Sequence, residues 1–140
     1  MVARKIDRPL LEQLMTGGRF EDESASSTAV DLDEAYLDRQ TGGDRALANE
    51  VLVLFREQAR RQYDVIVGEG DARTRRDAAH TLKGSARAIG AWRVAEIVQA
   101  IELGLADPGG RDMQSRFLEL DTALQSADEA MRQILARPVA

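Results

Sequence analysis

The 140-residue sequence contains no cysteine. Disulfides and thiolate metal sites are therefore excluded, and the absence is compatible with a reducing cytosol. No stretch approaches the ~20 apolar residues that a membrane span requires. Residues 1–18, MVARKIDRPLLEQLMTGG, also lack the uninterrupted apolar segment of a secretory signal. We therefore expect a soluble, cytoplasmic protein that does not associate with a membrane.

The sequence also lacks the period-two alternation of apolar and polar residues that is typical of a strand, and it contains no visible internal repeat. Its length suits a single domain with one core. Residues 19–29, RFEDESASSTA, are polar, acidic and aperiodic, so they cannot bury enough apolar surface to order themselves. We interpret residues 1–30 as a flexible leader, in which Leu10, Leu11, Leu14 and Met15 could form a short helix, and residues 31–137 as the folded domain.

From Asp31 onward the apolar residues recur with helical spacing. Asp31 followed by Glu34 resembles a capping box, which predicts a short first helix ending at the Gly42-Gly43 pair. Four longer helices should follow: from the N-cap Asp44 to about Gly68, from the N-cap Asp71 to Ile89 before Gly90, through Val94, Ile97, Val98, Ile101 and Leu105 to the break at Asp107-Pro108-Gly109-Gly110, and from Met113 to Ile134 before Pro138. The simplest architecture is all-α, an antiparallel four-helix bundle preceded by a short covering helix.

Charge is unevenly distributed along this chain of net charge −5. The segment from residue 73 to residue 93 holds six cations and one anion, a net +5, so the rest of the chain carries −10. The charged residues of the segment are Arg73, Arg75, Arg76, Asp77, Lys83, Arg87 and Arg93. A basic patch of this kind can steer an acidic partner, and the overall negative charge disfavours nucleic acid. A solvated helix face explains the charge alone equally well.

The third predicted helix carries the only histidine, His80. A helical wheel separates an inward face of mostly small residues, Ala78, Leu82, Ser85, Ala86 and Ile89, from an outward face with Arg73, Arg76, Asp77, His80, Lys83, Gly84 and Arg87. A lone histidine on a helix is usually an ordinary surface residue. Gly84 argues otherwise, since glycine within a helix costs roughly 1 kcal/mol relative to alanine. One turn after His80, it would leave the imidazole open to another protein.

The stretch AAHTLKGSARAIGAWRVAEIVQAIE, residues 78–102, resembles the histidine phosphotransfer (HPt) domains of bacterial and eukaryotic phosphorelays. Their signature is H-x-x-K-G-[SA], then a glycine and a helix ending in an apolar residue and Glu or Gln. The resemblance implies that His80 is phosphorylated, that Lys83 stabilises the phosphoryl group, that Gly84 admits the partner and that Ser85 is a small packing residue. Such a protein would be a phosphocarrier of a two-component system and not an enzyme.

Partners and cofactors follow from the same resemblance. This chain would exchange the phosphoryl group with response-regulator receiver domains and with a hybrid sensor histidine kinase. Mg²⁺ would come from the receiver, and this chain would bind no cofactor. We expect the chain to be a monomer. Arg76 and Arg87, one turn before and two turns after His80, are candidate docking residues, although solvated arginines are equally compatible with the pattern.

Glu102 is a further candidate, because Gly90 lies ten residues after His80 and twelve before Glu102. An antiparallel helix pair would bring the two side chains to similar height, so Glu102 could bond His80 and set its tautomer. The alternative is a salt bridge from Glu102 to Lys83 or another cation.

Other function classes fit less well. A zinc or di-iron site needs several facing ligands, and this chain has one histidine and no Glu-x-x-His pair. A nucleic-acid module would need a basic recognition helix in a recognisable motif. The serious alternative is an interaction protein with the HPt fold that binds a receiver or kinase without phosphotransfer. A histidine kinase would need a nucleotide-binding domain, which this sequence does not contain.

Overall fold

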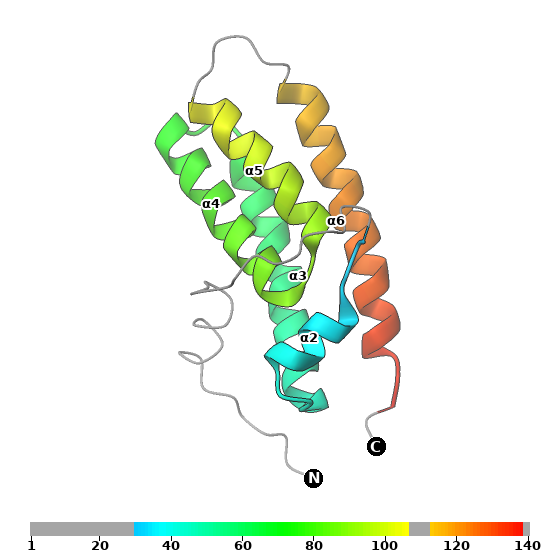
Figure 1. The fold of residues 1–140 in the computed structure, drawn as a ribbon. Helices are drawn as coiled ribbons and strands as arrows, with labels where there is room; N and C mark the ends of the chain where they lie inside the picture. Colours follow the sequence, from blue (N-terminus) through cyan, green and yellow to red (C-terminus); the bar gives the residue numbers. More distant parts are fainter. Residues whose placement is uncertain (1–29, 107–112, 139–140) are drawn as a thin grey trace.

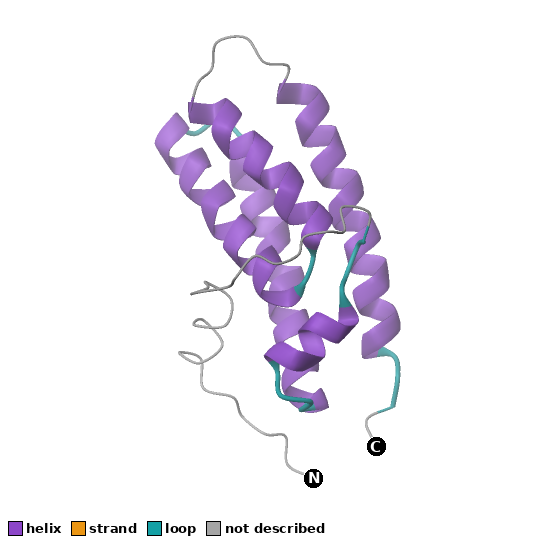
Figure 2. Cartoon of the chain, viewed as in Figure 1, coloured by secondary structure: helices purple, strands orange, loops and turns teal. Residues whose placement is uncertain are grey.

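The computed structural model describes residues 30–106 and 113–138. The predicted leader, Val30 excepted, and the Asp107-Pro108-Gly109-Gly110 break lie outside the described residues. Every regular element in the described part is a helix (Figures 1 and 2). The helices are α2 (Glu34–Gln40), α3 (Arg45–Val67), α4 (Ala72–Ile89), α5 (Trp92–Ala106) and α6 (Met113–Leu135). None of these helices has the length and apolar character needed to cross a bilayer.

Helices α3 to α6 form an antiparallel bundle, in which each helix contacts the next and α3 also contacts α6 (Figure 1). The predicted apolar faces meet in one core. In α6, Phe117, Leu120, Leu124 and the residues that continue their spacing are buried, and only Met113 at the start is partly exposed. The short helix α2 packs against α3 and α4, as the predicted covering helix should. The all-α bundle is therefore confirmed.

Aspartate side chains begin three of the helices. Asp44 accepts a hydrogen bond from the Leu47 amide at the start of α3, and Asp71 accepts one from the Thr74 amide at the start of α4, as predicted. The predicted start of α2 was wrong by two residues. Asp33, not Asp31, is its N-cap, because the Asp33 carboxylate accepts from the Tyr36 amide.

Asp33 also fixes the turn between α4 and α5. Its amide donates to the Gly90 carbonyl over 2.9 Å, and its second carboxylate oxygen accepts from the Trp92 indole over 3.0 Å. The Trp92 and Tyr36 rings meet edge to face at 4.8 Å. Gly90 has φ of +86°, and a Cβ there would lie 3.0 Å from Asp33 atoms, so only glycine fits without strain. These contacts hold α4 and α5 in one register.

Candidate functional site

His80 lies in the middle of α4, on the face that points away from the core. Its side chain is 71% exposed, whereas Ala78, Leu82, Ser85, Ala86 and Ile89 are buried. The two faces predicted for this helix are therefore present. Small residues on the buried face let α4 approach its neighbours closely, and the histidine stays open to a protein partner.

Glu102, on the adjacent helix α5, contacts His80 directly. Its Oε2 lies 3.0 Å from the imidazole Nδ1. The contact follows from the short turn at Gly90, which places two antiparallel helices side by side with their residues at matching heights (Figure 1). The predicted contact between Glu102 and His80 is confirmed; the role of Glu102 in the chemistry stays a prediction.

Lys83 does not project freely from the outward face of α4. Only 16% of its side chain is exposed, and its Nζ forms an ion pair with Glu102 Oε1 at 2.7 Å. The ion pair between Glu102 and Lys83, considered from the sequence as an alternative to the histidine contact, exists alongside it. Each oxygen of one carboxylate therefore has its own cationic or N–H partner.

The charge state of Glu102 follows from these neighbours. Partial burial acts to raise the pKa of Glu102, but the ammonium of Lys83 and the imidazole of His80 together outweigh it, and the pKa lies below its ordinary value. Glu102 is therefore ionised near neutral pH. An ionised carboxylate can only accept hydrogen bonds, so Nδ1 of His80 must carry the proton.

This arrangement defines the chemistry that the imidazole can perform. With the proton held at Nδ1, a neutral ring has its free lone pair on Nε2, the nitrogen that Glu102 does not contact. The ring is largely exposed. An imidazole nitrogen with a free lone pair, on a largely exposed ring, can act as a nucleophile toward a group that another molecule presents.

The basic segment does not form one continuous surface. Arg75 is directed toward α3 and α6, where it donates to the Ile66 carbonyl and lies over the Phe117 ring. Arg93, in the first turn of α5, forms an ion pair with Asp31 at 3.8 Å. The cations left around His80 are those of the outward face, so the charged patch is smaller than the sequence predicted.

The two candidate docking arginines differ in their surroundings. Arg87 is exposed and donates to Gln99 of α5 over 2.8 Å. Arg76 is half-buried and has no polar partner among the described residues. Gly84, one turn after His80, is also partly exposed. Gln99 was not predicted, although its position one turn before Glu102 on α5 places it at this edge.

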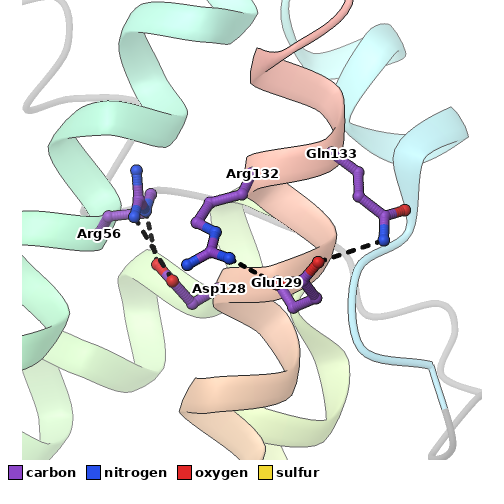
Figure 3. Close-up of polar contacts among 5 residues, drawn as sticks. All are labelled: Arg56, Asp128, Glu129, Arg132 and Gln133. Carbon is purple, nitrogen blue, oxygen red and sulfur yellow. Dashed lines mark hydrogen bonds and ion pairs between the residues drawn. The ribbon is translucent and has the colours of Figure 1, made fainter.

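A cleft lies elsewhere, between α3 and α6. It measures about 680 Å³, and none of its lining residues belongs to α4 or α5. Arg56 and Asp128 form an ion pair across it, and Arg132 pairs with Glu129 along α6 (Figure 3). The His80 site, in contrast, is on an exposed helix surface. A surface of this shape suits a reaction with a protein partner better than one with an enclosed small molecule.

No group of three or more histidine and carboxylate side chains within residues 30–106 and 113–138 could hold a metal ion.

Comparison with known proteins gives one positive result. The family model described as Hpt domain matches residues 50–134, which is more than half of the chain and includes His80, Lys83, Gly84 and Glu102. No curated protein and no solved structure matches the sequence.

Proposed function

Because this chain belongs to the Hpt domain family, whose members carry phosphoryl groups on histidine in phosphorelays, we propose that His80 is its phosphorylated residue. It would accept the group from an aspartyl phosphate on one receiver domain and pass it to the aspartate of another. The observation that carries this proposal is the contact of Glu102 with Nδ1, which leaves Nε2 free to react.

The proposed step is a substitution at phosphorus. The Nε2 lone pair of His80 attacks the phosphorus atom, the bond from phosphorus to the aspartate oxygen breaks, and the aspartate leaves as a carboxylate. The ring keeps its Nδ1 proton and gains positive charge as the N–P bond forms. The Glu102 carboxylate, 3.0 Å from Nδ1, offsets that charge. The reverse sequence of events delivers the group to the next receiver.

Lys83 contributes charge at the same place. Its ammonium neutralises Glu102 in the unphosphorylated protein. Phosphoryl oxygens on Nε2 would offer it a second anionic partner, so we infer that Lys83 shares its hydrogen bonds between the carboxylate and the phosphoryl group. This chain would therefore stabilise the phosphorylated state without a metal of its own. The Mg²⁺ needed for transfer would come from the acidic pocket of the receiver.

The partners that we propose are response-regulator receivers and the receiver of a hybrid sensor histidine kinase. Arg76 and Arg87 flank His80 on α4, and their positive charge complements the acidic residues around a receiver's aspartate. We propose that the protein acts as a cytoplasmic monomer. It would be a carrier and not an enzyme, since its own histidine is consumed and regenerated by the two partners.

A direct transfer experiment tests this function. The full chain is incubated with isolated receiver domains, each carrying a radiolabelled aspartyl phosphate, and Mg²⁺. We expect one acid-labile, alkali-stable label from the cognate receivers, and none on His80→Gln with the same helical circular dichroism. Label that persists in His80→Gln would overturn the assignment of His80.

The same experiment distinguishes the second candidate, an interaction protein with the HPt fold. A receiver that binds the wild-type chain in the presence of Mg²⁺ but never transfers label to it would favour that candidate. The intact set of His80, Lys83, Gly84 and Glu102 argues against it, because binding alone does not require an oriented nucleophile.

A further inference from the structure

One large apolar side chain is exposed beside the His80 site. Leu103, on α5, is 63% exposed and directly follows Glu102. The other exposed large hydrophobic residues among those described are on other helices: Val53 and Val65 on α3, and Leu118 on α6. Helix α4, which carries His80, exposes none. Among the described residues of this pair of helices, Leu103 is therefore the large apolar side chain that is left exposed.

The position of Leu103 relative to His80 follows from two hydrogen bonds between α4 and α5. Gln99 and Leu103 are four residues apart, so they lie one above the other on the same ridge of α5. Gln99 accepts a hydrogen bond from Arg87 of α4, and Glu102, adjacent to Leu103, contacts His80. The ridge therefore borders the outward face of α4, and Leu103 lies on the α5 side of the reactive imidazole.

A docked receiver would cover this ridge. A stable protein interface buries about 800 Å² on each partner, which corresponds to a patch roughly 30 Å across. One helical turn is about 5.4 Å, so a patch centred on His80 extends several turns along α4 and onto α5. Leu103 falls within it. Its surroundings, Arg87, Gln99 and Glu102, are polar, which is the usual composition of the rim around an apolar contact.

We infer that Leu103 is the apolar anchor of the receiver interface, and that its partner is a receiver domain with an apolar side chain bordering its acidic, Mg²⁺-binding pocket. This inference rests on the proposed function. The arginines on α4 increase the rate of encounter, since charges act at long range. Leu103 slows dissociation, since apolar contact acts only after the surfaces meet.

Leu103→Gln tests the inference, and Leu118→Gln is the matched control. The two leucines are similarly exposed, at 63% and 68%, and both are in helices. Glutamine has nearly the helix propensity of leucine, so neither change should alter thermal stability. The affinity of each variant is measured by calorimetry for the receiver domain that binds the wild-type chain most tightly. The same receiver is used in its phosphorylated form for KM and kcat.

We expect Leu103→Gln to weaken receiver affinity about tenfold and to raise KM by a similar factor at unchanged kcat. Leu118→Gln should match the wild type. Potassium phosphoramidate, which phosphorylates imidazole without a receiver, should label both variants at the wild-type rate. Equal affinity of the wild type and both variants would overturn the inference, and so would an equal loss in both variants. If no receiver transfers label but Leu103→Gln still weakens binding selectively, the phosphocarrier function fails while the docking assignment stands.

Discussion

Replacement of Glu102 by alanine should release the imidazole of His80 from a single tautomer. In the wild-type protein the ionised carboxylate accepts from Nδ1 over 3.0 Å. Alanine removes the acceptor, so the proton can move to Nε2 and block the nitrogen that has to react. Glutamine at the same position keeps an oxygen that can accept from Nδ1, but it loses the negative charge. The two variants therefore separate hydrogen bonding from charge.

The expected size of the effect follows from the exposure of the site. A hydrogen bond to a charged group contributes about 1.5–3 kcal/mol when it is shielded from water. His80 is 71% exposed, so we take about 1 kcal/mol, at the upper end for surface pairs. This corresponds to roughly a fivefold slower transfer for Glu102→Ala. Glu102→Gln should be slowed by about twofold, because it keeps the hydrogen bond and loses only the charge.

The single histidine makes the tautomer directly measurable. A chain labelled with ¹⁵N-histidine gives one Nδ1 and one Nε2 signal, whose chemical shifts report which nitrogen carries the proton. We expect the neutral wild-type ring to be protonated at Nδ1, and Glu102→Ala to contain a larger fraction of the Nε2–H form. An identical tautomer in both proteins, with unchanged transfer, would refute the orienting role of Glu102.

Glu102 should also link stability to pH. The pKa of Glu102 is lowered in the folded protein from its ordinary value of 4.5, so its ionised form favours folding. The stabilisation is complete above about pH 4.5 and is lost as the pH falls through the lower, folded-state value. Urea unfolding should show the wild type to be about 1 kcal/mol more stable than Glu102→Gln at neutral pH. A difference that does not diminish as the pH falls through the folded-state pKa of Glu102 would show that charge is not its source.

Four further changes test separate parts of the site and fold. Lys83→Ala should shorten the lifetime of phosphorylated His80 more than it weakens receiver binding, which a decay time course and calorimetry measure; equal loss in both would argue against contact with the phosphoryl group. Gly84→Gln should keep the wild-type melting temperature and lose receiver association, and normal affinity would show that Gly84 does not provide access. Serine at both Arg76 and Arg87 should slow association at low ionic strength and have little effect in high salt, as stopped-flow mixing can measure; no change in low salt would mean that both are simply solvated. Gly90→Ala should destabilise the fold by about 2 kcal/mol in urea unfolding, because φ is +86° and a Cβ would crowd Asp33; a wild-type midpoint would refute that strain.

The bundle could be predicted because local signals agree with the final packing. Apolar spacing marks the buried faces of α3 to α6, and Asp44, Asp71 and Gly90 mark helix ends by their own side-chain or backbone chemistry. The start of α2 was harder, since Asp31 and Asp33 both suit an N-cap. The choice depends on Trp92 and Gly90, which contact Asp33 from distant parts of the sequence.

The site was only partly predictable for a related reason. Antiparallel geometry places Glu102 beside His80, so that contact could be derived from the turn at Gly90. A helical wheel, however, assigns Lys83 to an exposed face, while its long side chain reaches across to α5 and is mostly covered there. The wheel describes a single helix, so it cannot show that one carboxylate serves both the imidazole and the ammonium.

The most direct test of the phosphocarrier account is to locate the phosphoryl group after transfer. The ¹⁵N-histidine-labelled chain is mixed with its phosphorylated cognate receiver and Mg²⁺, and ³¹P and ¹⁵N NMR identify the phosphorylated atom. We predict one phosphoryl group, bonded to Nε2 of His80, with Nδ1 still protonated beside Glu102. A phosphoryl group on Nδ1 or on any other residue would contradict the account. So would a chain that carries no phosphoryl group after the receiver has lost its own.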